Sequence, residues 1–129
     1  MIGKGCLLNR KSPKPKVSEM VLNCAGDYIA LGDSIGEKQE YLNGAVSAWN
    51  IACLDKKDRD RAIERYMAEY RKLNPLHNKQ DFRDVEEDLR SLIKQKDTLY
   101  PTVRTQIAGA HIQEIDGKDH VTVMSMRID

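Results

Sequence analysis

Residues 41–54, YLNGAVSAWNIACL, contain the only tryptophan of the chain within a run of mostly small and apolar residues. Most apolar positions recur at steps of three and four, the spacing that places side chains on one face of an α-helix. These positions are Tyr41, Leu42, Ala45, Val46, Trp49, Ala52 and Cys53. The pattern predicts a central helix from about residue 34 or 36 to residue 54, with Trp49 in the hydrophobic core.

Polar side chains form a narrow seam on this helix. Asn43, Ser47 and Asn50 lie near one another at helical spacing, and Asn50 is next to Trp49. A ligand site is one interpretation, because small molecules bind between the helices of bundles. The simpler interpretation, which we favour, is a core helix whose polar seam is exposed or contacts a neighbouring element.

The same periodicity predicts three more helices. They cover residues 17–28, about 55–74 and about 81–100. The ends of the last two are set by Pro75 and Pro101, because the residue before a proline avoids helical geometry.

The pattern changes after Pro101. Residues 103–115 and 120–128 are richer in Val, Ile, Thr and Met and partly alternate, which indicates β-strands. Asp116-Gly117 between them is a strong signal for a hairpin turn. The predicted fold class is therefore α+β and mainly helical, with about four α-helices packed as a small bundle and a C-terminal antiparallel β-hairpin.

A basic segment precedes this body. The chain has 129 residues and a net charge of +1, but residues 1–16 carry basic side chains and no acidic ones. The basic residues are Lys4, Arg10, Lys11, Lys14 and Lys16. We predict a flexible N-terminal arm over residues 1–16 and a single domain over 17–129. Weak, salt-dependent binding of nucleic acid by the arm is one hypothesis, and a merely solvated terminus is the simpler one.

The cysteine pattern and hydropathy predict the compartment. Cys6, Cys24 and Cys53 are widely spaced and form no C-x-x-C pair, which argues against a disulfide scaffold and fits a reducing environment. No run approaches the roughly 20 apolar residues of a membrane span, and the first residues lack the hydrophobic region of a signal peptide. We expect a cytoplasmic protein without membrane association.

No motif in the sequence indicates catalysis, a metal or a cofactor. His111 and His120 would share a face of the hairpin if its turn has two residues, but two histidines are too few for a convincing metal site. A group of acidic residues opens the last helix: Asp81, Asp84, Glu86, Glu87 and Asp88. We interpret them as solvated charges favoured by the helix dipole, with no apolar pocket nearby to raise a pKa.

Two sets of residues are candidate sites. A polar set between the helices and the hairpin could bind a small molecule or serve an enzyme: Lys96, Arg104, His111 and His120. A second set marks an interaction edge of the hairpin: Ile112, Val121, Val123 and Met124. We expect one apolar face of the hairpin to hold Ile107, Ile115, Met124, Met126 and Ile128, and the other to hold Ala108, Ala110, Ile112, Val121 and Val123.

The hairpin is where we expect function. Two strands alone are marginally stable in water, so one face should pack on the helices while the open edge pairs with a second copy or another partner strand. Complete coverage of the hairpin by the helices and the arm is the competing interpretation. The sequence favours a non-enzymatic protein-interaction domain, an adaptor or a regulator. The alternatives are a nucleic-acid-associated protein and a small-molecule binder or enzyme.

Overall fold

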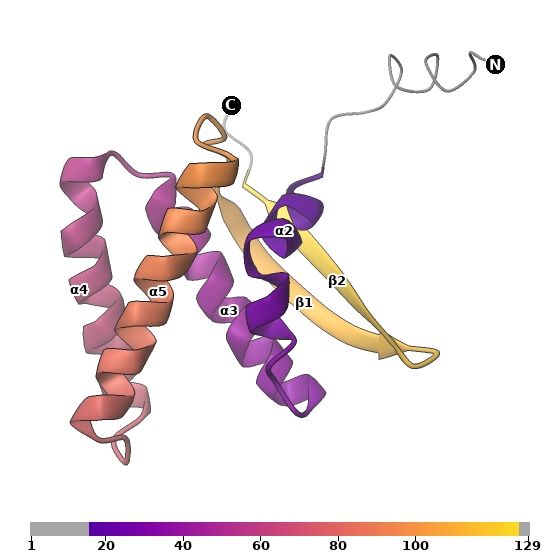
Figure 1. Cartoon of the computed structure of the whole chain (residues 1–129), viewed down its shortest axis with the longest axis horizontal. Coiled ribbons are helices and arrows are strands. Elements are labelled where there is room, and N and C mark those ends of the chain that lie inside the picture. The colour runs from indigo at the N-terminus through magenta and orange to yellow at the C-terminus, as the bar shows by residue number, and fades with distance from the viewer. Residues whose placement is uncertain (1–15, 127–129) are drawn as a thin grey trace.

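The computed structural model describes residues 16–126 of the chain. In this part, four helices precede a two-stranded antiparallel sheet, which confirms the predicted fold class (Figure 1). The elements are α2 (Val17–Ile29), α3 (Ile35–Ala52), α4 (Lys56–Leu73), α5 (Lys79–Leu99), β1 (Ile107–Ile115) and β2 (Lys118–Ser125). Residues 1–15, which hold most of the predicted basic arm, lie outside the described residues. No helix within residues 16–126 is long and apolar enough to cross a membrane.

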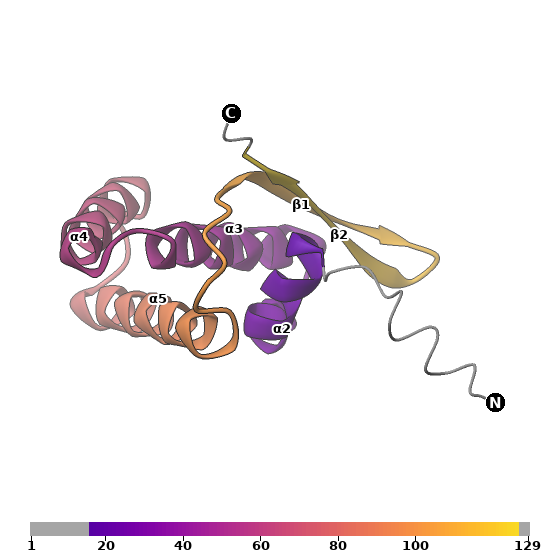
Figure 2. The same ribbon diagram turned by 90° about the horizontal axis from the view of Figure 1, so that it is seen from above.

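Helix α3 is the central element. It contacts α2, α4, α5 and β1, and Figure 2 shows it running between the hairpin on one side and α5 on the other. Its buried side chains are Leu42, Ala45, Ala48, Trp49, Ile51 and Ala52. The broad apolar surface predicted from residues 41–54 is therefore the surface on which the other elements pack.

Local signals set the ends of the helices. The Ser34 hydroxyl accepts a hydrogen bond from the Glu37 amide at 3.1 Å, and the Glu37 carboxylate accepts one from the Asp33 amide at 2.6 Å. This reciprocal capping satisfies amides that lack a partner inside the helix. Helices α4 and α5 end shortly before Pro75 and Pro101, as predicted.

Arg59 of α4 contacts both α3 and α5. Its guanidinium donates to the carbonyls of Ala52 at 2.7 Å and Leu54 at 3.3 Å, at the end of α3. It also forms an ion pair with Asp97 of α5 at 2.6 Å. Because the last carbonyls of a helix lack internal donors and carry partial negative charge, Arg59 caps α3 while it anchors α4 to α5.

The predicted hairpin turn lies at Asp116-Gly117, and its length, which the sequence left open, is two residues. Asp116 and Gly117 both have positive φ, 53° and 77°, which is the geometry of a type I′ turn. The strands pair antiparallel, with Ile112 opposite Val121 and Ala110 opposite Val123. Ile112 is buried and the other three are half-buried, so this face packs on the helices.

An irregularity in the pairing between Ile107 and Gly109 corrects the predicted faces. We expected Ile107 to share a face with Ile115 and Met124. Instead Ile107 is buried, whereas Ile115, Met124 and Ala108 are exposed. One extra residue at a bulge reverses the alternation of side chains along a strand, so Ile107 joins the inward face in place of Ala108.

Replacing the central ring tests the core. We expect Trp49→Ala to lower the free energy of unfolding by about 3–5 kcal/mol, the usual cost of truncating a large buried side chain. The indole is only 2% exposed, which is the physical reason for the cost. Urea denaturation followed by circular dichroism measures the effect. A cost near zero, or a water-exposed tryptophan emission spectrum in the native protein, would contradict the assignment.

Candidate functional site

Side chains of α3 bind the edge of β1 that faces away from β2. The Asn50 carboxamide donates to the Ile107 carbonyl at 2.9 Å and accepts from the Ile107 amide at 2.7 Å. The Gln39 carboxamide donates to the Ala110 carbonyl at 3.1 Å and accepts from the Ile112 amide at 2.9 Å. Each carboxamide presents one donor and one acceptor, as a strand backbone does. Helix α3 therefore takes the place of a third strand beside β1.

The segment before β1 is held in the same way. The Trp49 indole N–H donates to the Thr105 carbonyl at 2.8 Å, and the Lys96 ammonium donates to the Val103 carbonyl. Buried backbone carbonyls need such donors, since an unpaired one costs free energy comparable to a lost hydrogen bond. The central tryptophan is thus both a core side chain and an attachment point for the hairpin.

Lys96 is part of this attachment and has no room for a ligand beside it. Its side chain is 2% exposed, and its Nζ lies 5.3 Å from the centroid of the Trp49 ring. A cavity that both residues line has a volume of about 10 Å³, which is no larger than a water site. The geometry gives Lys96 a structural role.

The structure does not bring together the four residues of the predicted polar site. Lys96 is enclosed, while Arg104 is exposed and pairs with Asp55 at 3.0 Å. His111 and His120 share the exposed outer face of the hairpin, as expected for a two-residue turn. Residues 16–126 contain no group of three or more His, Cys, Asp or Glu side chains that could hold a metal ion.

The predicted interaction edge is also corrected. Ile112 is 3% exposed and belongs to the core, and Val121 and Val123 are half-buried against it. Only Met124 presents its side chain to solvent, with 62% exposed. The accessible parts of the hairpin are therefore the backbone edge of β2 and the outer face beside it. The face that carries Val121 and Val123 packs toward the helices.

A cleft that the sequence did not predict opens between the four helices, with a volume of about 680 Å³. Four tyrosines line it: Tyr28 of α2, Tyr41 of α3, and Tyr66 and Tyr70 of α4. The rings form two close pairs, with centroids 4.8 Å apart for Tyr28 and Tyr41 and 6.3 Å apart for Tyr66 and Tyr70. We call this cavity the tyrosine cleft.

Gly44 leaves space at one wall of the tyrosine cleft. A Cβ atom at this position would lie 3.7 Å from the hydroxyl of Tyr66 and 4.0 Å from that of Tyr28. Burial raises the pKa of both tyrosines, and the Asp88 carboxylate raises that of Tyr28 further. Their hydroxyls therefore stay neutral at physiological pH and remain hydrogen-bond donors.

The carboxylates of the tyrosine cleft have no cationic partner. They are Glu40, Glu69, Asp81, Asp84 and Asp88, and no lysine or arginine lines the cavity. None of the five forms an ion pair with a residue in the described part of the chain. Burial raises the pKa of Asp88, and the carboxylates of Asp84 and Glu87 raise it further. The expectation that the acids of α5 have no apolar pocket nearby was wrong, because the tyrosines of the pocket come from other helices.

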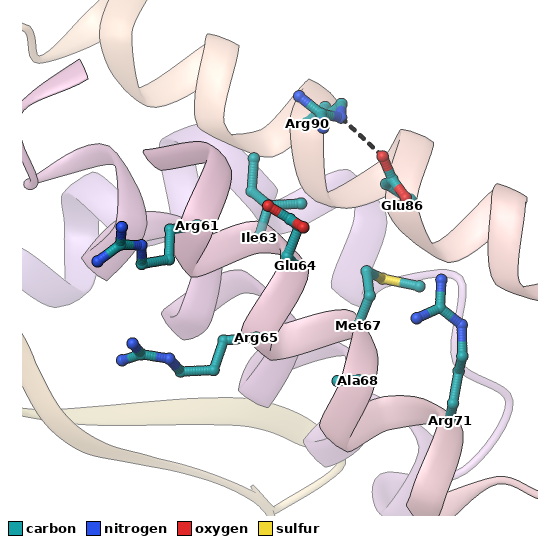
Figure 3. A pocket seen from close by; sticks show the side chains of 9 residues that line it. All are labelled: Arg61, Ile63, Glu64, Arg65, Met67, Ala68, Arg71, Glu86 and Arg90. Carbon is teal, nitrogen blue, oxygen red and sulfur yellow. Dashed lines mark hydrogen bonds and ion pairs between the residues drawn. The ribbon is translucent and has the colours of Figure 1, made fainter. Parts of the chain in front are cut away.

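A second depression, between α4 and α5, is lined by charged residues of both signs (Figure 3). Four arginines and two glutamates line it, above the buried side chains of Ile63 and Met67. Arg90 is paired with Glu86 at 3.0 Å and Asp60 at 3.7 Å. In Figure 3 the guanidinium groups point in different directions and do not converge. The depression is therefore a surface of mixed charge rather than an anion site.

Removing one carboxamide tests the attachment of β1. We expect Asn50→Ala to lower the free energy of unfolding by about 1–3 kcal/mol, because it leaves two buried backbone groups of Ile107 unpaired. Gln95→Ala, at an exposed position of α5, is the control and should change stability by less than about 0.5 kcal/mol. Hydrogen exchange reports the local effect. An Ile107 amide equally protected in Asn50→Ala and in the unmodified protein would contradict the role of Asn50.

Comparison of the chain with protein-family models, with curated proteins and with solved structures finds no match.

Proposed function

We propose that this chain is a non-enzymatic protein-interaction domain that assembles through the backbone edge of β2, and that the strand it receives is β2 of a second copy. One observation carries the proposal. The edge of β1 is occupied by the carboxamides of Gln39 and Asn50, whereas within residues 16–126 the outward backbone groups of β2 form no hydrogen bond. The one side-chain contact at this edge is the pair between Lys38 of α3 and the Asp119 carboxylate, at 2.6 Å, next to the turn.

The pairing register identifies the outward groups of β2. In a hairpin closed by a two-residue turn, the two residues beside the turn exchange backbone hydrogen bonds. From there, residues whose amide and carbonyl point to the partner strand alternate with residues whose amide and carbonyl point away from it. The contacts of Gln39 agree, because they engage Ala110 and Ile112 on the outer edge of β1. By the same alternation, the outward amides and carbonyls of β2 are those of Asp119, Val121 and Val123.

The side chains around this edge suit another strand. Residues 120–125, HVTVMS, contain no proline, lysine or acid, the residues with which natural proteins commonly protect an open edge, and the charged Lys118 and Asp119 of β2 lie only at its end beside the turn. Exposed apolar side chains flank it, with Met124 62% and Met126 46% exposed. A strand added here would cover apolar surface as well as satisfy backbone groups.

A second copy is complementary to the edge. In an antiparallel pair with its two-fold axis at Thr122, Val121 would lie opposite Val123 of the other copy, and His120 opposite Met124. No like charges face each other in this register. The two hairpins would form a four-stranded sheet in which the outward backbone groups of both β2 strands are paired.

Nucleic-acid binding by the arm and a small-molecule site between the helices and the hairpin gain no support from the described residues. Of the basic residues proposed to contact nucleic acid, only Lys16 is described, immediately before α2. The remaining four, Lys4, Arg10, Lys11 and Lys14, lie outside the described residues. The polar residues that suggested an enzyme or a small-molecule site on the hairpin are separated, as described above.

Charge placed across the two-fold axis tests the assembly. We expect the full chain to form a dimer with a Kd in the micromolar range, about the affinity of a modest interface. The double variant His120→Lys/Met124→Lys should be monomeric, because four positive charges would then meet across the two-fold axis. His120→Glu/Met124→Lys should restore the dimer, since opposite charges then face each other. Sedimentation velocity from about 1 to 500 μM measures the state, and circular dichroism checks folding.

Leu76→Lys is the matched control, because Leu76 is 97% exposed and lies in the loop between α4 and α5, away from β2. It should leave dimerisation unchanged. An unmodified chain that stays monomeric over the whole concentration range would overturn the proposal, as would equal loss of the dimer in Leu76→Lys.

A further inference from the structure

We propose that the tyrosine cleft is a binding site for an aliphatic polyamine, a flexible organic molecule that carries two or more ammonium groups on a hydrocarbon chain. This site is independent of the β2 edge, because only the four helices and the loop between α4 and α5 line it.

The size and the construction of the cavity suit a small molecule. Its volume of about 680 Å³ lies within the range of small-molecule sites in proteins. The lining residues come from α2, α3, α4 and α5, so the cavity exists only when these helices are packed. Most lining tyrosines are half-buried and their rings contact one another, which fixes the walls before a ligand arrives.

The tyrosine rings favour an organic cation. The face of an aromatic ring attracts an ammonium group, and the attraction grows when the pair is shielded from water. The rings also offer apolar surface to methylene groups. A ligand that alternates methylenes with ammonium groups therefore uses both properties of the same walls.

The carboxylates favour a ligand with several positive charges. No lysine or arginine lines the cavity, and Glu40, Glu69 and Asp88 have no ion pair within residues 16–126. Asp88 is exposed at the mouth of the cavity, and partial burial together with the nearby carboxylates of Asp84 and Glu87 raises its pKa. A bound cation would reduce the repulsion among these carboxylates.

The spacing of the carboxylates favours a chain over a metal ion. Residues 16–126 contain no group of three carboxylate, histidine or cysteine side chains close enough to hold a metal. Asp81, Asp84 and Asp88 instead follow one side of α5 over about 10 Å, at a rise of about 1.5 Å per residue. A linear polyamine presents ammonium groups at intervals along a comparable length, and Glu40 and Glu69 face it from α3 and α4.

Titration of the full chain with spermidine tests the proposal. By calorimetry at low salt we expect a Kd below about 100 μM, weaker binding of the shorter diamine putrescine, and no binding of a neutral diol of similar length. Glu69→Gln should weaken spermidine binding about five-fold or more, because it removes an exposed carboxylate at little risk to the fold. Glu64→Gln, on the same helix but outside the cleft, is the matched control and should have no effect.

A second pair of variants tests the aromatic face of Tyr66 separately from its hydroxyl group. Tyr66→Phe keeps the aromatic face and should retain most of the affinity. Tyr66→Leu removes the face and should weaken binding about five-fold or more. Circular dichroism confirms that both variants fold.

Three outcomes would overturn the site: no detectable spermidine binding, equal competition by Mg²⁺ at the same concentration, or identical affinities of Tyr66→Leu and the unmodified chain. The last two would mean that the carboxylates attract only a diffuse cloud of counterions. Dimerisation through β2 is measured separately and does not depend on any of these variants, so failure of one proposal leaves the other intact.

Discussion

A strand edge can be buried only if its backbone amides and carbonyls find hydrogen-bond partners, and this constraint organises the molecule. Helix α3 meets it for β1 with the carboxamides of Gln39 and Asn50 and, just before the strand, with the indole of Trp49. The hairpin is thereby held against one side of α3, with Ile107 and Ile112 in the core. Because β1 is the attached strand, β2 is necessarily the strand that faces outward.

The two sides of α3 have different consequences for function. One side carries Trp49 and Asn50 toward the hairpin, and the other presents Asn43, Gly44 and Ser47 to the tyrosine cleft. The polar seam noted in the sequence is therefore divided between two environments. Asn50 belongs to the structural attachment, whereas the remaining seam residues line a cavity. The favoured interpretation, a seam that contacts a neighbouring element, holds for Asn50, and the ligand-site interpretation stays a proposal for the seam residues that line the cavity.

The two surfaces that we propose to be functional differ in chemistry. The edge of β2 offers uncharged backbone groups flanked by methionine side chains, so its interactions are hydrogen bonds and apolar contact. The tyrosine cleft offers carboxylates and aromatic faces, so its interactions are electrostatic and screened by salt. The two lie on different elements of one domain, and either could be occupied without the other.

The sequence by itself determined what depends on local backbone preference and on periodicity. The ends of α4 and α5 follow from Pro75 and Pro101, the position of the hairpin turn from Asp116-Gly117, and the burial of Trp49 from the spacing of its apolar neighbours. Each of these features is decided by residues within a few positions of one another. The fold class followed from them.

Only the tertiary structure decided which distant residues meet. Asn50 and Ile107 are 57 positions apart, and no spacing in the sequence indicates that a carboxamide pairs with that strand edge. The bulge that buries Ile107 in place of Ala108 likewise reflects the fit of β1 against α3. The four tyrosines and five carboxylates of the cleft look like ordinary core and surface residues in their own helices. They become one site because the packing of the helices, set by the shapes of all their buried side chains together, brings their faces to a common cavity.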